Sequence, residues 1–298
     1  MRNFLPALSL ALVFSTSSFA QKVRLAGTDF FKGGVSSSIE TVASPLGLEA
    51  RWPGSYVALR QLQAGKVDMA ILAAPSPDNL PDLPGMYKMP LAYRLCRVIV
   101  AKDNPVESIT KEQLRAIFGS RARLRHESWR DLAKGDTGSS GGWSSRVIEP
   151  MVTNAFSSFS REVFLHNVLH EDALHPSVKS YPDEAALQKA FAGKRGAIAV
   201  VGSLSVEGYS KPLPVDMGAG EPFGATPENL YFGDYPLHMP CYLYFPSPDA
   251  AKLLPVVEAI YSGTVAQAIF LGGMAPVPDS FRDAEVNKLR KAAGIPAN

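Results

Sequence analysis

Cysteine is scarce in this chain of 298 residues, where Cys96 and Cys241 are the only two. Two thiols can form at most one disulfide, so a small scaffold held together by several bridges is excluded. A structural zinc site is not expected either, because there is no third cysteine and no histidine cluster at ligand spacing. His166 and His170 are spaced to share one helical face, but we interpret them as part of a packed or solvated surface.

The chain also lacks a strong charge of either sign. Lys and Arg total 30 against 28 Asp and Glu, which gives a net charge of +2, and no basic cluster stands out. Nucleic acid is therefore not expected as a partner. Hydrophobic residues make up 46% of the chain and charged residues 19%, a balance that favours a packed core over intrinsic disorder.

Long apolar runs are missing after the first twenty residues. No stretch of that later part approaches the roughly 18 consecutive apolar residues of a membrane-spanning helix. At the N-terminus, Arg2 precedes an apolar run over residues 4–14, and Ser18 and Ala20 supply the small residues of a cleavage site. This order predicts a secretory signal peptide cleaved after Ala20, so we expect a soluble periplasmic or secreted protein. An N-terminal core helix is disfavoured, because nothing after Ala20 continues its period.

Strands and helices alternate along the mature chain. The patterns predict strands at residues 23–26, 48–52 and 67–72, with helices at 36–44 and 55–62 between them. This spacing is typical of a parallel α/β sheet. Ligands of such sheets bind beyond the carboxyl ends of the strands.

Two longer apolar stretches, residues 91–101 and 239–245, are predicted as strands that bracket a second α/β unit. That unit contains predicted helices at 111–118, 161–169 and 183–192 and a strand at 197–201. Residues 253–261 and 265–271 have helical spacing and return to the first unit. We therefore expect residues 21–91 with 246–298 to form one lobe and residues 92–245 to form an inserted lobe, joined by two hinge strands.

Such a two-lobed α/β protein has a cleft at its hinge, where small molecules bind preferentially. Cys96 and Cys241 lie on the two predicted hinge strands, so in an exported protein we expect a disulfide between them. Two buried free thiols are the alternative. We expect a monomer.

Several segments of the chain are similar to segments of one known protein family and occur in the same order. They are residues 27–30 (Gly-Thr-Asp-Phe), 54–55, 59–70, 73–75, 104–110 (Asn-Pro-Val-Glu-Ser-Ile-Thr), 113–118, 129–132, 161–164, 196–202, 235–237 and 242–244. In these segments the chain resembles the phosphate-binding proteins of bacterial phosphate ABC transporters, a branch of the type II periplasmic binding proteins. The resemblance covers most of the mature chain and implies the fold of that family.

The resemblance also implies an anion site made of three loops, because phosphate is held by backbone N–H groups at helix starts and by hydroxyl side chains. The first loop carries over as Thr28 with its neighbours Asp29 and Phe30. The second carries over as Ser55 with Tyr56 beside it. The third gives Ser157, Ser158, Ser160 and Arg161.

Two departures from the family concern this site. Ala73 stands where the family has an Asp that accepts a hydrogen bond from protonated phosphate, and residues 154–160 lack the usual Arg, acidic residue and glycines. Asp29 could replace the acceptor and Arg161 the cation. Alternatively, Asp29 caps the first helix and Arg161 faces solvent. Phe156 and Phe159 in the third loop indicate either an organic ligand or simple packing.

The resemblance implies an exported solute-binding protein that captures phosphate or a related oxyanion for ABC-type uptake. Its partners would be the small anion and a membrane permease, with no cofactor and no enzymatic step. An exported sensor for an organic ligand would share the same cleft. Residues 138–142 match the Gly-x-Ser-x-Gly motif of serine hydrolases, but no strand is predicted ahead of that serine, which disfavours an enzyme.

Overall fold

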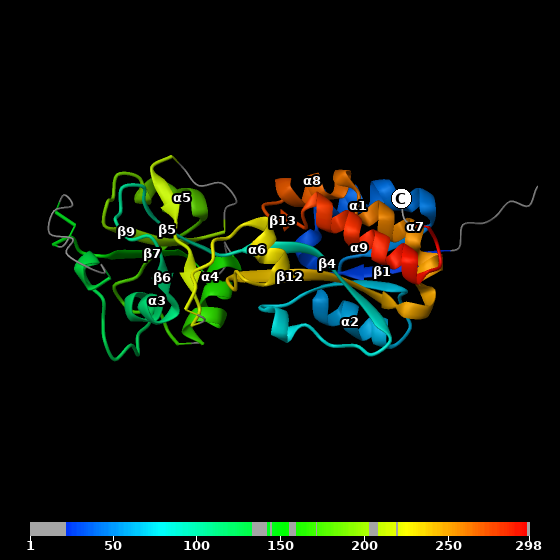
Figure 1. Ribbon diagram of the computed structural model, residues 1–298, viewed down its shortest axis with the longest axis horizontal. Helices are drawn as coiled ribbons and strands as arrows, with labels where there is room; N and C mark the ends of the chain where they lie inside the picture. Colours follow the sequence, from blue (N-terminus) through cyan, green and yellow to red (C-terminus); the bar gives the residue numbers. More distant parts are fainter. Residues whose placement is uncertain are drawn as a thin grey trace, which may run out of the picture.

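Two lobes lie side by side along the long axis of the computed structural model (Figure 1). The structure describes residues 22–132, 142–143, 145–154, 159–170, 172–202, 208–218 and 220–296. The predicted signal peptide lies outside these residues. The same holds for residues 138–141 of the hydrolase-like motif.

The first lobe is built on a six-stranded sheet with the order β13-β4-β12-β3-β1-β2. Its strands are β1 (Val23–Gly27), β2 (Leu48–Arg51), β3 (Met69–Ala73), β4 (Met86–Leu95), β12 (His238–Pro246) and β13 (Ala275–Pro276). β1 pairs in parallel with β2 and β3, as the alternation of strands and helices predicted, but β12 pairs antiparallel with β3 and β4. The sheet is therefore mixed, because the chain re-enters it from the second lobe.

Helices cover both faces of this sheet (Figure 1). On one face lie α1 (Gly34–Ala43), α7 (Ala250–Ile260), α8 (Gly263–Leu271) and α9 (Asp279–Ala292), and on the other lies α2 (Ser55–Gln63). The short 3-10 helices of this lobe are η1 (Asp29–Phe31), η2 (Ser44–Leu46), η3 (Pro77–Asn79) and η7 (Ser247–Asp249). Alternate residues of β1, β3 and β12 point to the two faces, so each face has its own apolar core.

The second lobe is built on a five-stranded sheet with the order β10-β5-β9-β7-β8. Its strands are β5 (Arg97–Ala101), β7 (Glu149–Thr153), β8 (Lys179–Tyr181), β9 (Ala197–Val201) and β10 (Ser210–Pro212), and β6 (Ile109–Thr110) pairs separately with β11 (Val215–Asp216). Its helices are α3 (Lys111–Phe118), η4 (Trp129–Asp131), α4 (Phe159–Phe164), a π-helix (Leu165–Leu169), α5 (Glu184–Phe191) and α6 (Pro227–Phe232). A capping box between Thr110 and Gln113 starts α3 where the sequence predicted it.

The chain passes between the lobes at Cys96 and Leu237. Cys96 separates β4 from β5, and its N–H donates to the Leu237 carbonyl at 2.9 Å. Residues 92–95 of β4 and 238–245 of β12 belong to the sheet of the first lobe. The limits of 92 and 245 expected for the inserted unit are therefore too wide, because both hinge strands extend the first sheet before they leave it.

The expected disulfide between Cys96 and Cys241 is wrong, since both are buried free thiols. Cys96 lies opposite Leu237, whereas Cys241 lies four residues further along β12, paired with Ala92. Four residues of strand span about 13 Å, while a disulfide needs Cα atoms within about 7 Å. The two strands are neighbours, as expected, but the thiols are out of register.

Helix α6 lies just before the chain returns to the first lobe, and it packs on that lobe. The Tyr231 ring of α6 stacks on the Phe281 ring of α9 with centroids 4.1 Å apart, and the Tyr231 hydroxyl donates to Glu285 Oε1 at 2.7 Å. α6 thus joins the return segment to the first lobe beside the hinge (Figure 1).

By length and composition, no single helix in the described part of the chain could cross a membrane. The segments Ser247–Ile260 and Gly263–Leu271, bent by 51° at the break between them, pass that test only as a pair.

Candidate functional site

The lobes meet along the helical segment 159–169 of the second lobe, which faces the loops after β1 and β3. The rings of Phe30 and Phe159 contact edge to face with centroids 4.3 Å apart. Further along, Asn167 Nδ2 donates to the Pro75 carbonyl at 3.1 Å, and His166 Nε2 lies 3.1 Å from Asn79 Oδ1. In these contacts, residues of one lobe lie directly against residues of the other lobe.

The polar groups of Thr28, in the first predicted loop, form hydrogen bonds within the protein. Thr28 is 1% exposed, its N–H donates to the Ile71 carbonyl at 2.8 Å, and its Oγ1 accepts from the Phe30 N–H at 3.4 Å. The loop leads into the single turn of η1, and α1 begins only at Gly34. Thr28 therefore caps a 3-10 turn instead of opening a long helix.

The second predicted loop joins the start of α2 to the end of β3. Gly54 has a φ of 99°, which glycine adopts at little cost, and Ser55 Oγ accepts the Ala73 N–H at 3.0 Å. Because that oxygen acts as an acceptor, the Ser55 hydroxyl hydrogen remains to be donated. A Cβ on Gly54 would lie 3.7 Å from Asp29 Oδ1, so the Asp29 carboxylate lies beside this turn.

Tyr56 is 72% exposed, and its hydroxyl accepts from Arg60 one turn along α2. This position is typical of a solvated helix surface. Ala73, by contrast, is partly buried at the end of β3 and is linked to Ser55 as described. The structure thus brings together Thr28, Asp29, Ser55 and Ala73, but gives no cleft contact for Tyr56 among the residues it describes.

In the third predicted loop, Phe156, Ser157 and Ser158 lie outside the described residues. Ser160 is 2% exposed and lies beside the hinge, since a Cβ on Gly202 would be 3.5 Å both from Ser160 Cβ and from the Leu95 carbonyl. Arg161 donates to Glu162 Oε1 at 2.6 Å. Its charge is thus balanced by the adjacent carboxylate.

Arg94 supplies a different cation at this place. It lies on β4 two residues before the hinge, and its guanidinium carbon is 5.6 Å from the Phe30 ring centroid and 4.9 Å from that of Phe159. Burial lowers the Arg94 pKa, yet a guanidinium remains protonated in proteins. Among the described residues, no carboxylate lies within ion-pair distance of Arg94, and its buried Nε has no hydrogen-bond partner.

The sequence reasoning missed Arg94, although a signal was present. Arg94 and Arg97 are the charged residues of the apolar stretch 91–101, and a cation in a strand that passes through a core is costly unless it has a purpose. The family pattern directed attention to the third loop instead. The sequence alone does not show that β4 places the Arg94 side chain beside Phe159 in the interlobe cleft.

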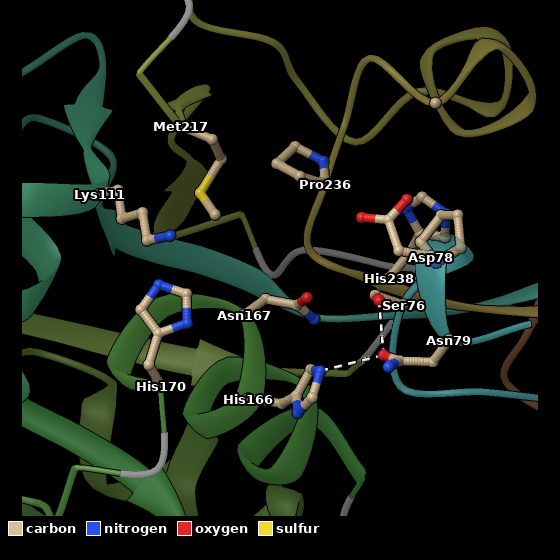
Figure 2. A pocket seen from close by; sticks show the side chains of 12 residues that line it. Ser76, Asp78, Asn79, Lys111, His166, Asn167, His170, Met217, Pro236 and His238 are labelled. Atoms are coloured by element: carbon tan, nitrogen blue, oxygen red, sulfur yellow. Dashed lines mark hydrogen bonds between the residues drawn. The ribbon is translucent and has the colours of Figure 1, made fainter.

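A cavity of about 720 Å³ lies further along the same interlobe space. Its lining comes from both lobes and from the hinge, and consists of Ser76, Pro77, Asp78, Asn79, Lys111, His166, Asn167, His170, Met217, Gly233, Pro236 and His238. Figure 2 shows Asn79 joined to Ser76 and to His166 across the gap between the lobes. No group of three potential metal ligands occurs in the described part of the chain.

Two lobes that meet around a hinge with a cleft between them are the arrangement found in solute-binding proteins. Residues 15–262 match the PBP superfamily domain, and the chain belongs to that superfamily. It carries a solute-binding domain like that of phosphate-binding proteins. Members of this family are typically non-enzymatic binding proteins.

Two curated relatives match about two thirds of this chain. The chain is 24% identical over 206 residues to the phosphate-binding protein PstS of Pseudomonas aeruginosa, a match that covers 67% of this chain and 63% of that protein. It is 28% identical over 212 residues to the protein SphX of Synechococcus elongatus, covering 68% and 59%. The matches thus span about three fifths of the length of these relatives.

Solved structures confirm the fold. The crystal structure of PstS from Borrelia burgdorferi superimposes with a TM-score of 0.66 at 14% identity, covering 86% of this chain and 98% of that one. The expected type II periplasmic-binding-protein fold, with mixed α/β lobes on two sheets, is therefore confirmed.

Proposed function

We propose that this protein is an exported solute-binding protein that captures a small oxyanion, phosphate or a related one, between its lobes for ABC-type uptake. The observation that carries the proposal is Arg94, a partly buried guanidinium at the lobe contact with no carboxylate partner among the described residues. A desolvated cation of this kind is stabilised when an anion supplies the missing partner. The relatives named for phosphate binding support the same ligand class.

Groups in the loops after β1 and before α2 also suit a protonated oxyanion. The Ser55 hydroxyl and the start of α2 are donors, and hydroxyls and helix starts both favour anions. The Asp29 carboxylate beside Gly54 would repel a fully ionised ligand, but it can accept a hydrogen bond from a protonated one. Asp29 would thereby take the role of the family Asp that Ala73 replaces, while Arg94, and not Arg161, supplies the cation.

The test compares purified wild-type protein with two arginine variants. In a thermal-shift panel of phosphate, sulfate, molybdate, phosphonates and small carboxylates, an oxyanion should raise the melting temperature, because it binds only the folded state. By calorimetry, Arg94→Gln should bind that oxyanion about tenfold more weakly or worse, since a charge-assisted contact is lost. Arg161→Gln is the matched control and should bind normally. Equal affinity for Arg94→Gln, or no shift with any oxyanion, would overturn the proposal.

A second candidate is an exported binding or sensor protein for an organic ligand. It is favoured by the Phe30 and Phe159 rings beside Arg94, which offer apolar surface that a bare oxyanion cannot use. Stabilisation by an organic anion alone in the same panel would select it.

A further inference from the structure

The cavity along the interlobe space has the size and walls of a site for an organic molecule. Its volume of about 720 Å³ falls in the range of about 300–1,000 Å³ that is usual for small-molecule pockets. Met217, Pro77 and Pro236 give it apolar surface, while Lys111 and three histidines give it polar groups. A bare oxyanion would leave most of this space to water.

Charge is distributed unevenly around the cavity. Lys111 and His170 lie on the same wall, and Asp78 lies across the cavity from them (Figure 2). No carboxylate of the described residues is within ion-pair distance of Lys111. The pKa of His170 is lowered by burial and by the neighbouring cations Lys111 and Arg115. This wall therefore carries the positive charge of Lys111, which forms no ion pair with a described carboxylate.

The backbone at this wall is also unusual. His170 has a φ of 51°, the one positive φ of a non-glycine residue in the described part of the chain, and it directly follows the π-helix Leu165–Leu169. Left-handed residues and π-helical turns both cost stability and occur preferentially at functional sites. Here they place the His170 imidazole beside the Lys111 ammonium.

We propose that this cavity is a second ligand site, which takes an organic anion with a compact apolar body. Its anionic group binds Lys111 and His170, and its apolar body packs on Met217 and Pro236. The site is separate from Arg94, since His166 follows Phe159 by seven residues on one helical segment, a rise of about 10 Å. This inference goes beyond capture of an inorganic oxyanion and does not depend on it.

Calorimetry of the purified protein with phenyl phosphate, benzoate and inorganic phosphate tests the inference. Phenyl phosphate, benzoate or both should bind at one cavity site. The probe with the higher affinity shows whether the site prefers a phosphate ester or a carboxylate. Lys111→Gln and His170→Asn should each weaken that probe about tenfold, as expected for loss of a charge-assisted contact. Asparagine tolerates the left-handed backbone, so the second variant should keep its fold.

Lys102→Gln, at an exposed lysine of the same lobe, is the matched control and should bind the probe as the wild type does. Arg94→Gln should also retain the organic probe, even where it loses inorganic phosphate. Unchanged affinity in both cavity variants, loss of the probe in Arg94→Gln alone, or no binding of either organic probe would overturn the second site. None of these outcomes depends on whether inorganic phosphate binds at Arg94.

Discussion

His238 is a buried titratable residue at the hinge whose environment makes folding sensitive to pH. It is 1% exposed, its Nδ1 donates to the Tyr235 carbonyl at 2.5 Å, and its ring meets Tyr93 edge to face. Burial lowers the pKa of His238 from 6.5 to about 4. Between these values the unfolded chain binds a proton that the folded chain excludes, so acid favours unfolding there.

We therefore expect His238 to remove about 3 kcal/mol from the free energy of unfolding as the pH falls from 6.5 to below 4. Urea unfolding across this range measures the loss. His238→Asn retains a donor toward Tyr235 but no proton-binding imidazole, so its stability should fall less steeply with pH. His126→Asn is the control, because it makes the same substitution at a partly buried histidine of the second lobe. If His238→Asn keeps the wild-type slope, burial of His238 is not the cause.

The residues of the cleft were only partly predictable. The family resemblance assigned Thr28, Ser55 and Ala73 to one cleft. All three lie next to predicted strand ends, and the carboxyl ends of parallel strands share one edge of a sheet. Arg161, which the family pattern suggested as the cation, forms an ion pair with the adjacent Glu162. Arg94 and Lys111 were not predicted as site residues. They lie on β4 and at the start of α3, and no local sequence pattern links these elements to the helical segment 159–169. Only tertiary packing brings them together.

The boundaries of helices and strands were predicted with different success. The helix over residues 111–118 was predicted correctly because Thr110 and Gln113 form a capping box around its first turn. The stretch 91–101 was predicted as one strand but forms β4 and β5, separated by Cys96. Apolar patterning identifies a buried strand, yet it carries no information about the point where that strand passes from one sheet to another.

The end of the π-helix at His170 supports a prediction about stability. A side chain in the left-handed region costs about 1 kcal/mol relative to glycine, which lacks the Cβ clash. His170→Gly should therefore raise the free energy of unfolding by about 0.5–1 kcal/mol while it weakens binding of an organic anion in the cavity. Denaturant unfolding and calorimetry on the same variant measure the two effects.

His175→Gly provides the comparison, since His175 has no positive φ and its Nδ1 accepts the Ser177 N–H at 3.2 Å. That change should lower stability, because it removes a hydrogen bond and adds chain entropy to the unfolded state. If both glycine variants lose stability equally, the left-handed backbone at His170 stores no strain.

For the molecule as a whole, the arrangement of the lobes depends on a few contacts across the cleft. The hinge itself is continuous at Cys96 and Leu237, and α6 ties the return segment to α9. Across the cleft the described polar contacts are those of His166 with Asn79 and of Asn167 with Pro75. Each of these two hydrogen bonds contributes about 1 kcal/mol, so we expect that few changes shift the lobes toward a more open arrangement.

The double variant His166→Ala with Asn167→Ala should therefore populate more open molecules in the absence of ligand. Small-angle scattering should show a larger radius of gyration than for the wild type, and an oxyanion bound at Arg94 should return it toward the wild-type value, because ligand bound by both lobes favours closure. The control is His126→Ala, at a histidine for which no contact across the cleft is found among the described residues. Identical scattering for the double variant and the wild type would mean that these two polar contacts do not determine the arrangement of the lobes.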